Sequence, residues 1–373
     1  MLHIVIDVRH LQDFGIGTYI RNLVRALAGR DQQNRYTLVA RPQDVADLAG
    51  IGPNFSVASY ARPETELAHN FTFPRFLKTF DAHLFHIPLN LVAWWMPKPY
   101  VVTIHDMSSL LFPARRDFRN TLRQENYRRG ASRATRVITV SHSTRRDLEN
   151  VLHIPTERIR TIYSAPDPAF GEAPDASIES HILERYSIHY PFILYAGTIR
   201  PQKNIARLIE AFAVVRVDLE NHPEYRNLHL VIIGDELSKN PSVRRAVAQA
   251  RMESVVRFLG FVPLETLRVF YRAASLFAFP SLYEGFGLAP LEAMVCGTPV
   301  VASDIPALVE AVGDAAELVS PDNVFDIARG LREVLLDDNK RRGLSAAGRE
   351  QARRFHWDHT ARDVLQIYQE MQK

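Results

Sequence analysis

Residues 275–294, SLFAFPSLYEGFGLAPLEAM, decide the fold class that the sequence predicts. The apolar run SLFAFPS is typical of a buried strand, YEGFG of a tight turn, and LAPLEAM of a helix with Pro290 in its first turn, where a missing N–H group costs little. A strand, a glycine turn and a helix N-terminus in this order form the repeating unit of doubly wound α/β sheets. Because ligands bind beyond the carboxyl ends of the strands in such folds, this turn is a candidate binding site.

The same alternation of short apolar runs and amphipathic stretches extends over the chain in two blocks. Apolar runs predict strands at residues 2–8, 36–40, 83–88, 100–105 and 136–141, and again at 192–198, 228–234, 256–262, 276–281 and 298–303. The helices between them include 18–29, which we expect to end at Gly29. This alternation favours parallel sheets covered by helices on both faces.

The length of the chain indicates two domains, because 373 residues exceed the usual size of a single core. The Pro-rich segment 164–177 lies between the two blocks. We therefore predict an α/β fold with two doubly wound, Rossmann-like domains, residues 1–175 and 176–354. A final helix over 355–373 follows, and the sequence does not decide whether it packs back on the N-terminal domain.

The composition is that of a soluble enzyme, with 46% hydrophobic and 23% charged residues. No run approaches the roughly 18 apolar residues of a membrane span. The N-terminal segment MLHIVIDVRH has no basic region ahead of its apolar run, so it indicates a first strand and a cytoplasmic protein. The single cysteine, Cys296, excludes an intrachain disulfide, and its small apolar neighbours predict a buried thiol without a redox role.

Positive charge is concentrated between Arg115 and Arg146, although the net charge of the chain is only +3. A solvated helical face is one interpretation, and attraction to anionic lipid or to a phosphate-bearing substrate is another. The adjacent tryptophans of residues 89–97, LNLVAWWMP, can meet a lipid, stack on a sugar or belong to the core. Peripheral contact with an anionic membrane is thus an open alternative, whereas nucleic acid is disfavoured because the basic window lacks interleaved aromatic residues.

Two carboxylates, Glu284 and Glu292, flank the glycine turn of residues 275–294. The free N–H groups at the start of the helix, together with its dipole, form a site for a phosphate or a diphosphate. Glu292 lies about one turn inside the helix, where it can accept hydrogen bonds from the vicinal hydroxyls of a ribose. Glu284 lies on the other side, where a sugar attached to the diphosphate would be. Alternatively, both glutamates are solvated surface residues.

The segments EGFGLAPLE, 284–292, and CGTPVVASDIPALVEAVGDAA, 296–316, resemble the retaining glycosyltransferases of family 4. The resemblance implies the GT-B fold, in which two Rossmann-like domains face each other across a cleft. It also implies transfer of a hexose from a nucleotide diphosphate donor with retained anomeric configuration. Glu284 would contact the donor sugar and Glu292 the ribose. The donor-binding backbone implied by the same resemblance comprises Gly285, Phe286, Gly287, Leu288 and Ala289.

A second segment, YAGTIRPQKN, presents Arg200 and Lys203 after a predicted strand. Positive charge here would stabilise a departing diphosphate by electrostatic preorganisation. The common family pattern has an arginine directly after the glycine, but Thr198 occupies that place in this chain. Both cations could otherwise be surface residues, although the helix dipole disfavours them at this position.

Further positions of the resemblance contribute to the predicted site. His105, at the end of a predicted strand, would lie beside the donor sugar and act catalytically with Glu284, Arg200 and Lys203. Gly15 and Gly17 would approach the donor, unless they only form a turn. Gly234 and Val262 would line the nucleobase, next to Asp235 and Phe261. Ser141 we expect to cap the following helix.

The sequence contains neither a D-x-D motif after a strand nor a Cys/His set, so we expect no metal and no cofactor, with a GDP- or UDP-hexose as substrate. Residues 197–204, GTIRPQKN, resemble the GTLEPRKN version of bacterial mannosyl- and rhamnosyltransferases, which favours GDP-mannose and a glycan or lipid-linked acceptor. The alternatives are a phosphorylase or epimerase of similar shape and a noncatalytic nucleotide-sugar-binding protein.

Overall fold

The computed structural model describes residues 1–13, 15–64, 66–90, 92–112, 118–235, 237 and 240–372, but not the side chains of 118–120, 122 and 123. The chain forms two compact units. The first unit comprises Met1–Ala165 and Phe355–Lys373, and the second comprises Pro166–Arg354. The arginines at 115 and 116, part of the basic window, lie outside the described residues.

The first unit ends ten residues before the boundary placed at 175, because the segment after Ala165 packs on the second unit. Its short helix η4 (Pro168–Gly171) places the Phe170 ring 5.5 Å from that of Tyr271. Arg268 donates to the carbonyl of Ala169 (2.9 Å) and Arg272 to that of Phe170 (3.2 Å). The Pro-rich composition of this segment therefore does not make it a free linker.

The first unit has a seven-stranded parallel sheet in the order β3-β2-β1-β4-β5-β6-β7. Its strands are β1 (His3–Asp7), β2 (Arg35–Ala40), β3 (Phe55–Ser59), β4 (Leu84–Ile87), β5 (Tyr100–Ile104), β6 (Arg136–Thr139) and β7 (Ile159–Thr161). Its helices are α1 (Ile16–Arg30), α2 (His69–Lys78), α3 (Ser108–Leu111), α4 (Phe118–Arg133), α5 (His142–Leu152) and α14 (Trp357–Glu370). Parallel pairing brings the carboxyl ends of all seven strands to one edge.

The second unit has a six-stranded parallel sheet in the order β10-β9-β8-β11-β12-β13. Its strands are β8 (Phe192–Gly197), β9 (His229–Gly234), β10 (Val256–Gly260), β11 (Leu276–Phe279), β12 (Val300–Ser303) and β13 (Glu317–Val319). Its helices are α6 (Ala176–Arg185), α7 (Ile205–Asp218), α8 (Pro241–Ala250), α9 (Leu264–Ala273), α10 (Leu288–Cys296), α11 (Pro306–Val312), α12 (Val324–Leu336) and α13 (Asp338–Ala352). Both sheets are doubly wound, as the sequence predicts.

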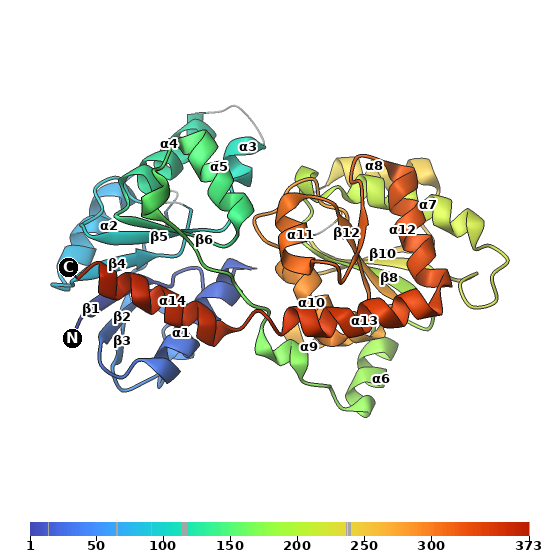
Figure 1. Ribbon diagram of the computed structural model, residues 1–373, viewed down its shortest axis with the longest axis horizontal. Helices are drawn as coiled ribbons and strands as arrows, with labels where there is room; N and C mark the ends of the chain where they lie inside the picture. Colours follow the sequence, from blue (N-terminus) through green and yellow to red (C-terminus); the bar gives the residue numbers. More distant parts are fainter. Residues whose placement is uncertain are drawn as a thin grey trace. The chain divides into compact units, whose positions relative to one another are not determined.

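The C-terminal helix α14 belongs to the first unit, where it lies beside α1 (Figure 1). Trp357, Val364 and Ile367 of α14 are part of the same buried apolar cluster as residues of α1. The Tyr368 hydroxyl bonds to Nδ1 of His86 (2.6 Å), whose Nε2 bonds to Thr103 (2.8 Å). His86 is thus a buried core residue with both ring nitrogens satisfied.

Three strands of the structure have no counterpart in the sequence prediction. They are β3, β7 and β13, and each lies at an outer position of its sheet. The prediction that α1 ends at Gly29 is also wrong by one residue, because the helix runs to Arg30 and the N–H group of Asp31 still bonds to the Leu27 carbonyl.

Candidate active site

The order of the strands in the second unit reverses between β8 and β11. A crevice opens at such a switch point, beyond the carboxyl ends of the two strands, and it is where doubly wound sheets bind ligands. The loop after β8 carries Arg200 and Lys203, and the loop after β11 carries the glycine turn with Glu284. The two segments predicted to carry the chemistry therefore meet at this switch point.

Hydrogen bonds fasten the two loops to each other. The N–H group of Leu282 donates to the Gln202 carbonyl (2.7 Å). The amide of Asn204 donates to the carbonyls of Pro280 (3.0 Å) and Pro321 (2.7 Å). Asn204 has a left-handed backbone (φ 62°), which asparagine tolerates better than most residues. These contacts hold the loop after β8 in a fixed position against the end of β11.

Lys203 and Glu284 form an ion pair, with 2.5 Å between Nζ and Oε1. Their side chains are 18% and 11% exposed. The ammonium also lies 5.4 Å from the centre of the Phe279 ring. An ammonium carries three N–H donors, so Lys203 can bind an incoming anion while it keeps its bond to Glu284.

Arg200 precedes the short helix η5 (Pro201–Lys203) and is exposed. Its guanidinium has no hydrogen bond or ion pair with any residue that the structure describes. The structure thus brings Lys203 and Glu284 together but not Arg200, whose contact with a diphosphate stays a prediction.

The helix α10 begins directly after the glycine turn, with Gly287 as its N-cap, a residue without a side chain that could bond to the first turn. Gly287 has φ 134°, and a Cβ there would lie 2.8 Å from Cδ2 of Leu308, so the turn requires glycine. The first N–H groups of a helix have no partner within it. Those of Leu288 and Ala289 lie in this first turn and can bind an anion. The Phe286 side chain is buried beside them.

Glu292 lies one turn inside α10, and its Oε2 accepts a hydrogen bond from the Tyr271 hydroxyl (3.1 Å). Burial raises the pKa of Glu292 to about 7, against the opposing effect of the Tyr271 hydrogen bond and with a further contribution from Asp167. A carboxylate whose ionised form is disfavoured by burial gains more from ligand hydroxyls that donate to it than an exposed carboxylate does.

The predicted nucleobase wall is formed by the ends of β9 and β10. A Cβ on Gly234 would lie 1.9 Å from the Gly197 carbonyl oxygen, so packing between β9 and β8 by itself requires this glycine. Asp235 accepts a hydrogen bond from the N–H group of Ile199 (2.8 Å) and braces the loop after β8. Val262 is buried, whereas the Phe261 side chain is 67% exposed.

In the first unit, His105 follows β5 and is fixed by the loop after β4. Its Nε2 bonds to the Pro88 carbonyl (3.1 Å), and its N–H group donates to Oδ1 of Asn90 (3.1 Å). Its ring packs edge-on against Tyr19, with 4.8 Å between the centroids. Burial lowers the pKa of His105 to about 4, against smaller opposing contributions from the Pro88 carbonyl and Asp106. His105 is therefore a neutral imidazole at physiological pH, with Nε2 protonated.

Local geometry accounts for both glycines at the start of α1. Gly15, the N-cap, has φ 60°. A Cβ on Gly17 would lie 2.4 Å from the Leu11 carbonyl oxygen. Their contact with a donor therefore stays a prediction. Ser141 caps α5 as expected, since its side chain accepts a hydrogen bond from the N–H group of Thr144 (2.9 Å).

A charged cluster that the sequence analysis missed lies at the switch point of the first unit, where the strand order reverses between β1 and β4. Arg9 forms two hydrogen bonds to Asp7 (2.8 and 2.6 Å) and an ion pair with Glu64 (3.1 Å). His10 lies between Glu64 (2.8 Å) and Asp13 (2.6 Å), one carboxylate on each ring nitrogen. The sequence signal was an Asp-x-Arg-His run at the end of an apolar strand.

The cluster sets the ionisation of its own members. Burial alone would lower the pKa of His10, but hydrogen bonds and charges of Glu64 and then Asp13 raise it to about 9. For Glu64 the effects are reversed. Burial alone would raise the pKa of Glu64, but the His10 hydrogen bond and the charge of Arg9 lower it below its usual value. His10 is therefore a cation at neutral pH.

Among the described residues, no group of three or more His, Cys, Asp or Glu side chains is arranged to hold a metal ion. Within the same part of the chain, no helix is both long and apolar enough to cross a membrane.

Comparison with protein families gives one match in each unit. Residues 15–170 match the model of Glycosyltransferase Family 4, and residues 186–351 match that of Glycosyl transferases group 1. Together with two Rossmann-like sheets, these matches define a glycosyltransferase of the GT-B fold. The chain belongs to glycosyltransferase family 4.

Individual relatives agree with this assignment. The chain is 30% identical over 294 residues to the O-antigen chain mannosyltransferase B of Escherichia coli, a match that covers 78% of this chain and 75% of the relative. It is 31% identical over 286 residues to the serotype-specific mannosyltransferase WbdA of Escherichia coli, of which the match covers only 34%. It is also 36% identical over 182 residues, 48% of this chain and 42% of the relative, to the D-inositol 3-phosphate glycosyltransferase of Jonesia denitrificans.

Solved structures share the fold. The sucrose-phosphate synthase of Thermosynechococcus elongatus has a TM-score of 0.79 at 22% identity, covering 100% of this chain and 99% of that one. Anabaena HepE in complex with UDP-glucose also has a TM-score of 0.79, at 17% identity, covering 99% of this chain and 100% of that one. The predicted GT-B fold class is thus confirmed.

Proposed function

We propose that this glycosyltransferase moves mannose from GDP-mannose to a glycan or lipid-linked acceptor, with retained anomeric configuration and without a metal ion. The observation that carries the proposal is the meeting of Lys203, Glu284 and the uncapped start of α10 at the switch point of the second unit. The choice of mannose rests on the two Escherichia coli mannosyltransferases at about 30% identity. A UDP-sugar is the second candidate donor, since the HepE structure contains UDP-glucose.

Four groups of the second unit fit the three parts of a nucleotide sugar. Glu292 accepts hydrogen bonds from the ribose hydroxyls, and the N–H groups of Leu288 and Ala289 bind the diphosphate. Lys203 binds the diphosphate on its other side, and Glu284 accepts hydrogen bonds from the sugar. The fixed position of these groups matters, because donors that are already oriented need no reorganisation as charge develops.

The chemical step proceeds on one face of the sugar. The bond between the anomeric carbon and the diphosphate breaks, and the Lys203 ammonium stabilises the negative charge on the leaving oxygen. The acceptor hydroxyl then bonds to the anomeric carbon from the face that the diphosphate leaves. The departing phosphate takes the proton of that hydroxyl. Trapping of a covalent sugar on the enzyme would contradict this path, because a double displacement needs a protein nucleophile on the opposite face.

Calorimetry with GDP, UDP, ADP and dTDP, with and without Mg²⁺, tests the donor site in the wild type and in Glu292→Ala. We expect one nucleotide to bind without metal and to bind more weakly to the variant. Equal binding to both proteins would show that Glu292 does not hold a ribose. Transfer from GDP-mannose to a mannose-terminated oligosaccharide, with the product anomer assigned by NMR, then tests the reaction.

The same experiments separate the alternatives. A noncatalytic nucleotide-sugar-binding protein would bind the donor but transfer nothing to any acceptor. A phosphorylase would carry pyridoxal phosphate, which is detected by its absorbance.

We also propose that the first unit binds anionic membranes, on the basis of an exposed aromatic pair. Phe71 of α2 and Trp95 are 51% and 48% exposed, with ring centroids 4.6 Å apart. Arg129 of α4 lies over the neighbouring Trp94 ring at 5.9 Å. Exposed aromatic rings next to arginine are suited to the interface of an anionic bilayer.

Co-sedimentation with phosphatidylglycerol vesicles tests this surface. The wild type should sediment at low salt and be released at high salt, and Phe71→Ser with Trp95→Ser should sediment at least several-fold less. Phe325→Ser, at a phenylalanine of α12 that is 74% exposed, is the matched control. Failure of the wild type to sediment at low salt would remove the proposal.

A further inference from the structure

A cavity of about 440 Å³ lies in the second unit, away from the predicted donor site. Ser275 and Pro299, which line it, directly precede β11 and β12. The cavity is therefore at the amino-terminal edge of the sheet, whereas Lys203 and Glu284 follow the carboxyl ends of β8 and β11. Its volume is within the range of small-molecule sites.

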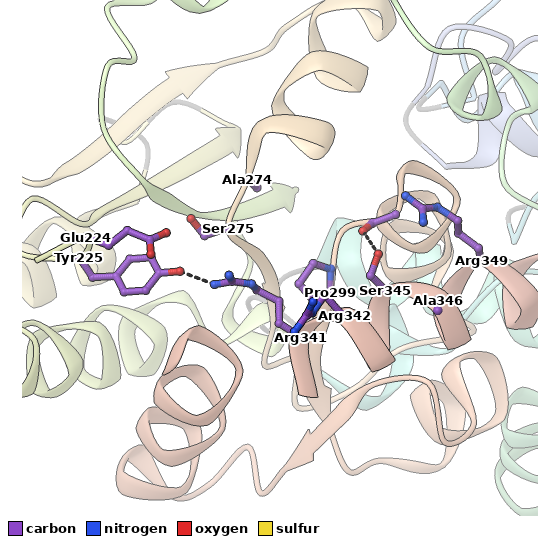
Figure 2. Close-up of a pocket in the computed structure, with 11 residues that line it drawn as sticks. Glu224, Tyr225, Ala274, Ser275, Pro299, Arg341, Arg342, Ser345, Ala346 and Arg349 are labelled. Atoms are coloured by element: carbon purple, nitrogen blue, oxygen red, sulfur yellow. Dashed lines mark hydrogen bonds between the residues drawn. The ribbon is translucent and has the colours of Figure 1, made fainter. Parts of the chain in front are cut away.

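The lining of this cavity is predominantly basic. Arg341, Arg342 and Arg349 project into it from α13, and Glu224 is the acidic residue among those that line it (Figure 2). Together they give a local excess of two positive charges over the carboxylate, since three arginines face one glutamate. A concave basic surface concentrates anions.

Arg341 has protein partners that fix its position. It donates to the Tyr225 hydroxyl, as Figure 2 shows, and forms an ion pair with Asp338 (2.5 Å). The phenol ring of Tyr225 is thereby held against the cavity wall. Arg341 and Tyr225 thus form a rigid side of the cavity.

Among the described residues, no carboxylate forms an ion pair with Arg342 or Arg349. Arg342 bonds to the Asp338 carbonyl (3.2 Å) and to Oδ1 of Asn339 (3.0 Å), both uncharged. The Arg349 guanidinium has no hydrogen bond or ion pair with any described residue. These two guanidiniums therefore retain charge and N–H donors for a ligand.

The site of Arg349 is shaped by the backbone beside it. A Cβ on Gly297 would lie 1.9 Å from Nη2 of Arg349, so the glycine makes room for the guanidinium. Gly297 is the C-cap of α10, where the helix dipole favours a cation. The helix dipole explains why Arg349 lies at this position. It explains neither the presence of Arg342 nor the open volume between the two side chains.

We propose that this cavity binds the phosphate group of a phosphorylated sugar. Arg342 and Arg349 donate to the phosphate oxygens, for which the planar guanidinium is well matched. Ser275, Pro299 and the closely packed Tyr225, which is 2% exposed, form the part of the wall next to which the sugar would lie. The ligand would occupy the end of α10 opposite to Glu292 and would not compete with the nucleotide.

Calorimetry of the full chain with mannose 6-phosphate tests the proposal, with mannose as the uncharged probe. We expect saturable binding of the phosphate ester, no binding of mannose, and at least about tenfold weaker binding to the Arg342→Gln/Arg349→Gln double variant, because that variant lacks two charged hydrogen-bond donors to the phosphate. Arg353→Gln is the matched control, since Arg353 is exposed, pairs with Glu350 and does not line the cavity. Binding should also be unchanged in Glu292→Gln and in saturating GDP.

A lipid headgroup is a second source of the same phosphate, and vesicles of phosphatidylglycerol distinguish it. If the wild type sediments with the vesicles, the double variant does not, and mannose 6-phosphate does not bind, the cavity is a site for a lipid phosphate. The proposal would be overturned if GDP displaced mannose 6-phosphate, or if the double variant bound mannose 6-phosphate as tightly as the wild type. It would also be overturned if the wild type bound neither the sugar phosphate at about 10 mM nor the vesicles.

Discussion

At the switch point of the first unit, Arg9 contacts two carboxylates and its side chain is 4% exposed, whereas at that of the second unit Lys203 contacts one carboxylate and is 18% exposed. Both cations follow the first strand of their unit in chain order. The Arg9 network satisfies its own charges, so removing a member leaves a buried charge alone. In the ion pair of Lys203 with Glu284, the ammonium keeps N–H donors that can bind a ligand. We therefore expect a similar position to serve stability in the first unit and binding in the second.

The largest effect should come from Arg9→Met. It leaves Asp7, which is fully buried, without its cation, and breaking a buried ion pair costs about 3–5 kcal/mol. Hydrogen exchange of the β1 amides measures the opening free energy of the first unit. Arg25→Met, at an exposed arginine of α1, is the control. A loss below about 1 kcal/mol would contradict a structural role for the cluster.

Glu284→Gln should act on the reaction and not on folding. We expect kcat to fall by about 10²–10³, the effect of removing one oriented group that acts on the transition state. GDP should bind as tightly as before or more tightly, because Lys203 no longer shares its charge with a carboxylate. Steady-state kinetics and calorimetry measure both, with Glu210→Gln on the exposed face of α7 as the control. Tenfold weaker GDP binding would show that Glu284 itself holds the nucleotide.

A further expected difference between the two units is the pH dependence that His10 gives to the stability of the first unit. His10 has a pKa raised to about 9, so its contribution is fully present below its unfolded pKa and is lost as the pH rises through 9. Between pH 7 and pH 9 the first unit should lose about 2 kcal/mol of opening free energy, and His10→Gln should remove this dependence. If hydrogen exchange of β1, corrected for its intrinsic pH dependence, gives the same stability at both pH values, His10 is not the cation inferred here.

The sequence predicted the local structure at the switch point of the second unit better than that of the first, because the signal of the second is local. A strand, a glycine turn and a helix start are adjacent along the chain, and they place Glu284 and the start of α10 without further information. The ion pair between Lys203 and Glu284 was not predicted, since 81 residues separate its partners. The Arg9 cluster depends on Glu64, which arrives from a loop 54 residues beyond His10.

A common physical reason explains why the sequence did not predict β3, β7 and β13. β7 and β13 have three residues each, too few for a periodic pattern, and β3 is a half-exposed strand with two serines. All three are edge strands, which pair on one side only and carry a weaker apolar signal than central strands. The central strands are buried over most of their length and were predicted.

The smallest expected effect is the pH dependence of GDP binding, which tests the ionisation of Glu292. Its pKa of about 7 means that the carboxylate is mostly ionised at pH 8 and mostly protonated at pH 6. Only the ionised form accepts hydrogen bonds from both ribose hydroxyls, so the affinity for GDP should fall about tenfold between pH 8 and pH 6, or about 1.4 kcal/mol. Glu292→Gln should bind GDP more weakly at pH 8 and without this dependence. A GDP affinity that changes equally with pH in both proteins would assign the titration to another group, such as the nucleotide phosphates, and would leave the second unit without a ribose-binding carboxylate.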